Sequence, residues 1–250
     1  MKFMLVCGGS AGHINPAIAT ADALRKLLPG CEILFIGAGR SMEKKLVPQA
    51  GYELSNIDML GLSRGFTPKK LKHNSVAAIK LATASRRAEK LIREYMPSVV
   101  IGTGGYICYP VLKAAAKAKV PTALHESNAV PGLTAKVLAP IVDKIFTSFE
   151  ESAALYKDPS KVNVMATPVR ANFMRYTRER ARHDLAIGGD MPVVVSFWGS
   201  LGASGMNGYM ADFIRRNIES ESFRHIHAAG TPEAAEKIKA EIGKELPAFI

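Results

Sequence analysis

The chain has 250 residues, 48% of them hydrophobic, which suffices to bury one large core or two smaller ones. Its formal net charge of +11 is concentrated in residues 64–93, where nine Lys or Arg side chains stand against a single acid. No apolar run approaches the ~20 residues that cross a bilayer, and no cleavable leader is visible, so we expect neither a transmembrane helix nor a signal peptide. The three cysteines, Cys7, Cys31 and Cys108, lack metal-ligand spacing and predict buried free thiols in a reducing cytosol.

Strand-like and helical patterns alternate from the first residues onward. Strands are expected at residues 3–7, 32–36, 53–58, 98–102, 121–125, 143–147 and 162–165. Helices are expected at residues 16–28, 41–50, 76–95, 110–118, 132–139 and 150–156. This alternation predicts a parallel sheet with helices on both faces. Asn15 is expected to cap the first helix, with Pro16 in its first turn.

A second alternating unit begins after residue 166. Its expected elements are a strand at 192–198, a helix at 206–219, a strand at 224–228 and a helix at 232–244. The first of these strands is a near-continuous apolar run, which is typical of a buried parallel strand. Two β-α units make an incomplete sheet. We therefore expect two α/β domains, residues 1–166 and an unfinished 167–250, in a fragment of a longer protein.

Two glycine-rich stretches carry the clearest chemical signal. Residues 8–13 (GGSAGH) and 102–106 (GTGGY) each follow a strand and lead into a helix, the geometry in which backbone N–H groups hold a phosphate. Neither stretch has the spacing of a dinucleotide fingerprint or the Lys-Ser/Thr of a P-loop, and a turn without a ligand stays open for each. His13 lies at the carboxyl edge of the predicted sheet, where its imidazole could take a proton from a hydroxyl.

Residues 124–128 (LHESN) place polar side chains at the end of another strand. His125, Glu126 and Asn128 could bind the hydroxyls of a sugar, or they could support one another in a hydrogen-bonded network. A third glycine turn, residues 199–205, follows the first strand of the second unit.

The basic segment combines a predicted loop at 61–75 with an amphipathic helix. Apolar and basic side chains expected at its surface are Leu62, Phe66, Lys69, Lys70, Lys72, Lys80, Arg86 and Arg87. A solvated helix face is one interpretation, and nucleic acid is disfavoured because interleaved aromatics and a recognisable motif are missing. An anionic membrane surface is the third, since each nearby Lys or Arg contributes ~1 kcal/mol and exposed Leu and Phe can enter the interface.

Taken in order, the motifs GGSAGH-x-x-P, GTGGY, LHESN, TPVR and WGSLGA resemble the MurG family of bacterial peptidoglycan glycosyltransferases, in glycosyltransferase family 28. The resemblance implies a GT-B fold of two Rossmann-like domains. It implies inverting transfer of GlcNAc from UDP-GlcNAc to the C4 hydroxyl of MurNAc in lipid I, which gives lipid II, without a metal or other cofactor. It also implies a peripheral protein on the cytoplasmic face of the bacterial plasma membrane, with lipid I, UDP-GlcNAc and the anionic surface as partners and no nucleic acid.

The same resemblance implies roles for individual residues. His13 would be the general base, and Glu126 would share the catalytic work. The acceptor, through its diphosphate and sugar, would contact Ser10, Gly12, Gly104, Gly105, Tyr106, His125 and Asn128. The donor would contact Ser10, Ala11, Gly12, His13, Asn128, Arg170 and Ser200.

The chain departs from the family pattern at several positions. Ser10 and Ala11 stand where the family has Thr and Gly, Thr167 where it has Asn, and Trp198 where it has Gly. The chain also stops before the family's uridine, ribose and GlcNAc motifs, so we expect little or no activity from these residues alone. Two alternatives stay open: a GT-B lipid glycosyltransferase of the diacylglycerol type, and a non-catalytic module that binds the acceptor.

Overall fold

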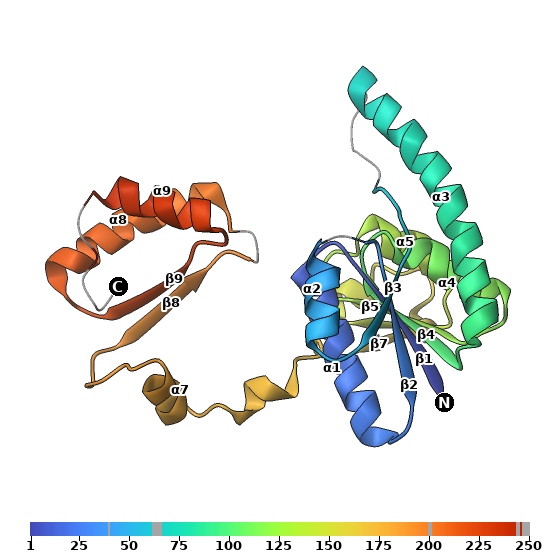
Figure 1. The fold of residues 1–250 in the computed structure, drawn as a ribbon, viewed down its shortest axis with the longest axis horizontal. Coiled ribbons are helices and arrows are strands. Elements are labelled where there is room, and N and C mark those ends of the chain that lie inside the picture. The colour runs from blue at the N-terminus through green and yellow to red at the C-terminus, as the bar shows by residue number, and fades with distance from the viewer. Residues whose placement is uncertain (40, 62–66, 200–201, 244–245, 247–250) are drawn as a thin grey trace. The chain divides into compact units, whose positions relative to one another are not determined.

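The computed structural model describes the chain except residues 40, 62–66, 200–201, 244–245 and 247–250 (Figure 1). Contacts divide the chain into two compact units, Met1–Arg175 and Tyr176–Ile250. The sequence analysis places the division after residue 166, so the first unit also holds the TPVR motif and the short 3-10 helix Ala171–Arg175. Each unit is described by itself.

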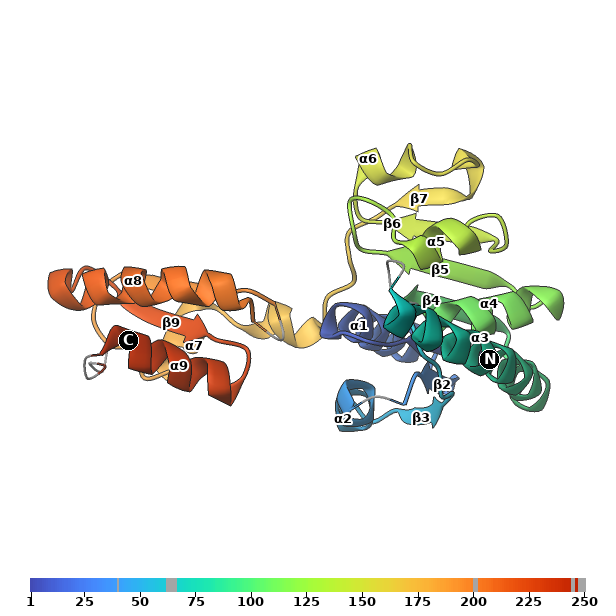
Figure 2. The ribbon, with the colours of Figure 1, turned by 90° about the horizontal axis from the view of Figure 1, so that it is seen from above.

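The described part of the first unit forms a seven-stranded parallel sheet of order β3-β2-β1-β4-β5-β6-β7, which can be followed across Figure 2. The strands are β1 Lys2–Cys7, β2 Glu32–Gly37, β3 Glu53–Asn56, β4 Val99–Gly104, β5 Thr122–Glu126, β6 Lys144–Thr147 and β7 Val162–Val164. The α-helices are α1 Ala11–Leu27, α2 Ser41–Gln49, α3 Pro68–Tyr95, α4 Cys108–Lys117, α5 Leu133–Leu138 and α6 Glu150–Ala153. The predicted α/β class and its parallel sheet are confirmed.

Helices cover both faces of the sheet, as the alternation predicts. Successive residues of a strand point to opposite faces. In β1, Met4 and Val6 pack with side chains of α3 and α4, whereas Leu5 and Cys7 pack with side chains of α1. All four are fully buried or nearly so. The carboxyl end of β1 is therefore held from both sides, and the loop that follows it starts from a rigid position.

The first helix begins earlier than predicted. It starts at Ala11, with Ser10 as the N-cap residue in extended conformation (φ −148°), and Pro16 lies inside it. The prediction that Asn15 caps this helix is therefore wrong. Gly9 has a φ of +90°, a left-handed conformation that turns the chain as soon as β1 ends. The helix thus follows the strand directly, and His13 lies in its first turn.

The helix α3 also begins earlier, at Pro68, so residues 68–75 are helical and not part of a loop. The Thr67 hydroxyl accepts a hydrogen bond from the Lys70 amide at 3.3 Å, and Pro68 suits the first turn. At 1.5 Å per residue, the 28 residues of α3 span about 42 Å. Figure 1 shows its N-terminal part projecting beyond the rest of the unit.

The second unit contains a parallel pair of strands, β8 Val193–Phe197 and β9 Arg224–Ala228. Its described helices are α7 Arg178–Asp184, α8 Ser204–Ser220 and α9 Pro232–Ile242. The prediction that the first of these strands is buried is wrong for this structure. Val195 is 58% exposed and Phe197 66% exposed. The helices α8 and α9 pack on one face of the strand pair. The other face meets α7 only across a hollow of about 360 Å³.

Two cysteines are buried free thiols, as predicted. Cys7 and Cys108 have no exposed surface, and Cys31 is half-buried. The Cys108 thiol donates to the Val6 carbonyl oxygen at 3.3 Å, and burial raises its pKa to about 12. Within the described residues, no helix combines the length and the apolar character needed to cross a bilayer.

A pH-dependent link joins β5 to the start of β6. The hydroxyl and the backbone amide of Thr122 each donate a hydrogen bond of 2.8 Å to the Asp143 carboxylate. These bonds, that of the hydroxyl most of all, lower the pKa of Asp143. A lowered pKa means that the carboxylate stabilises the fold above the pKa of the unfolded chain, and that this contribution is lost as the pH falls through the folded pKa.

We therefore expect Asp143→Asn to lower the free energy of unfolding of the first unit at pH 7 by about 1 kcal/mol, a value discounted for the exposure of this side chain. The difference from wild type should fade below about pH 4. Urea unfolding followed by circular dichroism measures it, while fluorescence of the single tryptophan, Trp198, reports on the second unit. Asp190→Asn, at an exposed aspartate, is the control; a difference between Asp143→Asn and wild type that stays constant with pH would contradict the argument.

Candidate active site

The two glycine loops of the first unit meet at the carboxyl edge of the sheet. They follow β1 and β4, which are paired neighbours. The Thr103 hydroxyl donates to the His13 carbonyl oxygen at 2.7 Å, which joins the loops directly. A Cβ atom on Gly104 would collide with the His13 imidazole, and one on Gly105 would collide with the Gly8 carbonyl oxygen. Because these two residues have no side chain, the loops can pack against each other. This packing explains the two glycines without reference to a phosphate.

The His13 ring is held in one orientation and one neutral tautomer. Its Nδ1 atom lies 2.9 Å from the Gly8 carbonyl oxygen, and a carbonyl can only accept, so Nδ1 carries the proton and donates. The Ser10 hydroxyl is a more distant neighbour of the same nitrogen, at 3.4 Å. In the neutral ring, Nε2 then bears the lone pair. The half-buried His13 thus has the form that a general base requires.

The first turn of α1 offers backbone donors to an anion. The amides of His13 and Ile14 both donate to the Ser10 carbonyl oxygen at 3.1 Å. The amides of Ala11 and Gly12 precede these two, and their own helix has no carbonyl to which they can donate. Gly12 is exposed, so a ligand can approach its backbone. The positive end of the helix dipole adds to this attraction for a phosphate.

One side chain beneath the first loop escaped the sequence analysis. Glu43, in the first turn of α2, has no exposed surface, and its Oε1 atom accepts a hydrogen bond from the Gly9 amide at 3.1 Å. That amide is therefore not available to a ligand. The signal that the sequence offers is an acid a few residues beyond the second strand.

The LHESN motif forms a turn organised by its acid. The Glu126 carboxylate accepts from the amide and the side chain of Asn128, at 2.9 and 2.7 Å, and from the Gly132 amide at 3.0 Å. Both carboxylate oxygens are therefore engaged within the loop. This matches the network alternative for Glu126 and Asn128, and the catalytic role expected for Glu126 stays a prediction.

His125 lies on the opposite face of β5 from Glu126 and is only 4% exposed. Burial lowers its pKa; the nearby Glu126 carboxylate opposes that shift and His13 adds to it. The effect of His13 places the two imidazoles in the same part of the site. Both His125 ring nitrogens are buried, and neither has a hydrogen-bond partner among the described residues. The Tyr106 ring, by contrast, packs closely against Gly61 and lines the second loop.

The two residues expected to hold a donor diphosphate lie in different units. Arg170 belongs to the first unit and is half-buried. Its segment is tied to the end of β6 by a 2.6 Å hydrogen bond between the hydroxyls of Thr167 and Ser148. Ser200 lies outside the described residues. After it, Gly202 (φ +69°) packs so closely on the Ala229 carbonyl that a Cβ atom would collide with it, and α8 begins soon afterwards.

The second unit also holds a serine and two histidines that sequence patterns did not single out. The Ser196 hydroxyl lies 2.8 Å from both His225 Nε2 and His227 Nδ1. Burial lowers the pKa of both imidazoles. A hydroxyl has one proton, so it donates to one ring and accepts from the other; the two neutral rings then present one donor and one acceptor on their far nitrogens.

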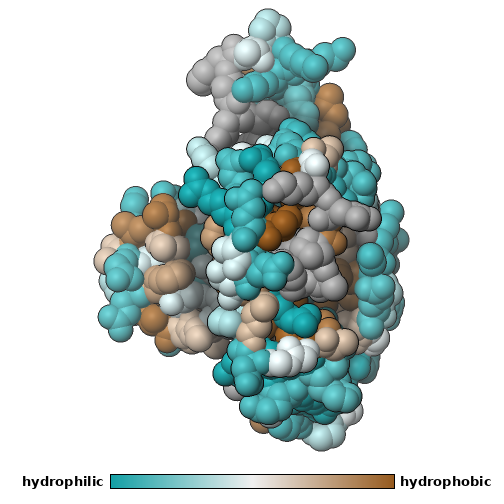
Figure 3. All heavy atoms as spheres, turned by 90° about the vertical axis from the view of Figure 1, so that its left-hand side faces the viewer, coloured by the Kyte–Doolittle hydropathy of each residue, from teal (hydrophilic) through white to brown (hydrophobic). Residues whose placement is uncertain are grey.

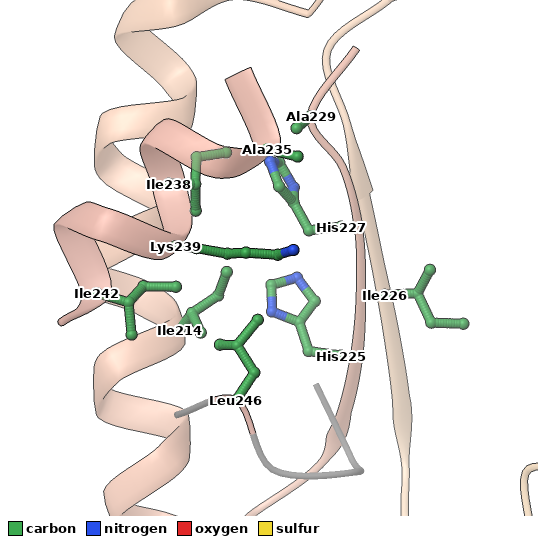
Figure 4. Close-up of a pocket in the computed structure, with 10 residues that line it drawn as sticks. All are labelled: Ile214, His225, Ile226, His227, Ala229, Ala235, Ile238, Lys239, Ile242 and Leu246. Atoms are coloured by element: carbon green, nitrogen blue, oxygen red, sulfur yellow. The ribbon is translucent and has the colours of Figure 1, made fainter. Parts of the chain in front are cut away.

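These histidines line a cavity of about 260 Å³ between β9 and the helices α8 and α9. Figure 4 shows His225, His227 and Lys239 on the cavity side of β9, while Ile226 points to the other side of the strand. The cavity contains none of the site residues expected from the sequence. Across the described ranges, no three His, Cys, Asp or Glu side chains gather in a way that could hold a metal ion.

The expected membrane residues separate into distinct sets. Leu71 is 66% exposed near the projecting end of α3, and Ile79, about two turns further along the helix, is 68% exposed. Figure 3 shows hydrophobic and hydrophilic residues side by side at this end, which stands at the top. The exposed cations there are Lys69, Lys70 and Lys72.

The other expected cations lie further along the same helix. Lys80 forms an ion pair with Asp58 at 2.7 Å and is therefore partly neutralised. Arg86 and Arg87 lie roughly 20 Å beyond Leu71 along the helix axis, at 1.5 Å per residue. Leu62 and Phe66 lie outside the described residues.

Known proteins resemble this chain along most of its length. The glycosyltransferase family 28 N-terminal domain matches residues 3–147. A UDP-N-acetylglucosamine--N-acetylmuramyl-(pentapeptide) pyrophosphoryl-undecaprenol N-acetylglucosamine transferase from Acetivibrio thermocellus is 43% identical over 92% of this chain and 61% of its own length. The protein of the same name from Caldanaerobacter subterraneus is 38% identical over 96% of the chain and 65% of its own length. The chain thus spans less than two thirds of these curated relatives.

The fold has a matching solved structure. The crystal structure of MurG from Acinetobacter baumannii aligns with a TM-score of 0.65 at 23% identity, over 99% of this chain and 65% of that one. At this identity the likeness concerns the fold alone.

The packing of one loop on the other predicts unequal effects of two alanine substitutions. Gly9 and Gly105 have nearly the same φ, +90° and +88°, so both variants carry left-handed strain of about 1–2 kcal/mol. A Cβ on Gly9 meets open space among the described residues, whereas one on Gly105 meets the Gly8 carbonyl. We expect Gly105→Ala to destabilise the first unit by about 3 kcal/mol or more in urea unfolding. Equal losses from the two variants would contradict this packing.

Proposed function

Because the chain belongs to glycosyltransferase family 28, we propose that it serves the transfer of GlcNAc from UDP-GlcNAc to the C4 hydroxyl of MurNAc in lipid I, which gives lipid II in peptidoglycan synthesis. The observation that carries the proposal is the His13 imidazole, which the Gly8 carbonyl holds through Nδ1 at the meeting point of two glycine loops, and whose Nε2 has no hydrogen bond to a described residue. The names of the curated relatives supply the donor and the lipid-linked acceptor.

In the proposed reaction, His13 Nε2 accepts the proton of the acceptor hydroxyl. The hydroxyl oxygen forms a bond to C1 of GlcNAc from the face opposite the leaving group, and the bond from C1 to the diphosphate oxygen breaks. UDP leaves, and the anomeric centre is inverted. The chemistry asks for a base beside the acceptor and for positive charge near the departing diphosphate, and it needs no covalent intermediate.

The acceptor diphosphate fits the start of α1. The amides of Ala11 and Gly12 and the hydroxyl of Ser10 are the proposed donors there, and His125 and Asn128, at the end of β5, are the proposed neighbours of the sugar. We assign the acceptor to the first unit and the nucleotide to the second, where the helix α8 begins just after a glycine turn at the end of β8. Arg170 and Ser200 are the proposed contacts for the donor diphosphate.

A membrane-bound acceptor requires the protein to reach the bilayer surface. The projecting end of α3 combines Leu71 and Ile79 with Lys69, Lys70 and Lys72, an arrangement suited to an anionic interface. We therefore propose peripheral association with the cytoplasmic face of the bacterial plasma membrane through this end of the helix.

Because we expect little or no activity from residues 1–250 alone, turnover of labelled UDP-GlcNAc with lipid I is measured in this chain extended by the C-terminal part of the Acetivibrio thermocellus relative. We expect His13→Gln to lower the rate by ~10²–10⁴-fold, as loss of a general base does, without changing the stability of the fold. His183→Gln, at a histidine with an 89% exposed side chain, is the matched control and should keep the wild-type rate. Equal rates for wild type and His13→Gln would remove His13 from this role.

Two further outcomes separate the alternatives. Preferential transfer to diacylglycerol, with both acceptors offered together, would identify a different lipid glycosyltransferase. Binding of lipid I with no calorimetric signal for UDP-GlcNAc would instead identify a non-catalytic module that binds the acceptor.

Flotation with vesicles tests the membrane proposal. Substituting Lys69, Lys70 and Lys72 together by Gln removes about 3 kcal/mol of attraction, so binding to anionic vesicles should weaken on the order of 100-fold. The double variant Arg86→Gln with Arg87→Gln is the control and should bind nearly as wild type, because these side chains lie far down the helix. Equal flotation of the wild type with anionic and neutral vesicles would show that this helix end is only a solvated surface.

A further inference from the structure

A single peptide group connects a buried carboxylate to the His13 imidazole. The peptide between Gly8 and Gly9 has its N–H bonded to Glu43 Oε1 at 3.1 Å and its carbonyl oxygen bonded to His13 Nδ1 at 2.9 Å. The same peptide group therefore donates one hydrogen bond to Glu43 and accepts the other from His13. We propose that Glu43 is a positioning residue that acts through this peptide to fix the tautomer of His13.

The surroundings of Glu43 are shaped to admit its carboxylate. A Cβ atom on Gly8 would lie 2.8 Å from Glu43 Oε1, and one on Gly37 would lie 3.3 Å from the Cβ and Cγ atoms of Glu43. Any larger residue at Gly8 would push the carboxylate away from the peptide. The glycines that end β1 and β2 thus make room for a side chain from α2 under the first loop.

Burial of the Glu43 carboxylate lowers the stability of the fold, which indicates that this side chain has a specific role. Glu43 has no exposed surface, and no ion pair joins it to any of the described cations. Its Oε2 atom has no hydrogen-bond partner among the described residues. An unpaired buried carboxylate lowers stability unless its hydrogen bonds compensate, and the Gly9 amide is the donor that the structure provides.

The physical effect of this arrangement is polarisation. A charged acceptor on the N–H draws the amide dipole toward itself and makes the carbonyl oxygen at the other end a stronger acceptor. The Gly8 oxygen then holds the Nδ1 proton of His13 more firmly, which leaves the lone pair on Nε2. That this lone pair takes a proton from a sugar hydroxyl rests on the proposed function; the tautomer itself does not.

The positive φ of Gly9 and the packing of Gly105 both fix the orientation of the peptide between Gly8 and Gly9. A φ of +90° turns the peptide so that its N–H faces α2 while its carbonyl faces α1. Gly105 lies directly against that carbonyl oxygen, which hinders the peptide from flipping. The loop therefore has one orientation in which this peptide can form hydrogen bonds with both Glu43 and His13.

Nitrogen-15 NMR of the histidine rings in the full 250-residue chain tests the inference without any assay of transfer. At about pH 9, well above the ordinary titration range of imidazole, the two ring nitrogens have separate signals for each tautomer. We expect the Nδ1–H form of His13 to predominate by about tenfold or more in the wild type. In Glu43→Gln the amide oxygen still accepts from Gly9, so the tautomer should be retained.

Glu43→Met keeps the length of the side chain but removes the acceptor, and the preference for the Nδ1–H form should fall by about tenfold. Glu89→Gln is the control, because Glu89 pairs with Lys117 on the surface at 2.9 Å and lies outside the site. An unchanged tautomer ratio in a folded Glu43→Met chain would overturn the inference.

A second measurement serves if Glu43→Met does not fold. In Glu43→Gln, which removes the charge but keeps an acceptor, the Gly9 amide proton should shift relative to the wild type, and the Gly8 carbonyl carbon should shift with it. Movement of the amide without the carbonyl would show that the peptide does not transmit the charge. Failure of His13→Gln to reduce transfer, with the tautomer result intact, would reject the proposed function and leave this inference standing.

Discussion

The structure of the candidate site depends on how closely the second glycine loop lies on the first. Gly104 stands against the His13 imidazole and Gly105 against the Gly8 carbonyl, with no space for a side chain at either position. The Thr103 hydroxyl ties the same two loops through the His13 carbonyl oxygen. This contact requires β1 and β4 to be neighbours, which a parallel sheet with a crossover connection provides. The imidazole is thus positioned by two strands that are almost a hundred residues apart in the sequence.

Charge is distributed around this contact in a consistent order. A buried carboxylate lies beneath the first loop, the open amides of α1 point outward from it, and the imidazole stands between the two. In the proposed function, a diphosphate would meet the amides and the positive end of the helix dipole, while the Glu43 carboxylate stays bonded to the Gly9 amide. The cations that would bring the protein to an anionic surface lie at the end of α3 and stay out of the pocket. Attraction to the membrane and recognition of the phosphate therefore use separate groups.

Several expectations failed for identifiable reasons. Asn15 reads as a helix cap because Pro16 follows it, but the left-handed Gly9 lets the helix begin at Ala11. The basic residues 68–75 read as a loop, although Thr67 and Pro68 together carry an N-terminal signal for α3. The apolar strand β8 reads as buried on both faces, but α8 and α9 cover only one of them.

By itself, the sequence determined the α/β class, the number of strands in the first unit and their positions along the chain, and the position of His13 just beyond a strand, because hydrophobic period and turn chemistry are local properties. It also supported the family through five motifs in order. Only the tertiary structure decided why Gly104 and Gly105 are glycines, that Glu43 reaches the Gly9 amide, and which nitrogen of His13 carries the proton. These features depend on contacts between segments brought together by the sheet, and no local pattern specifies which distant side chain will fill the space beneath a loop.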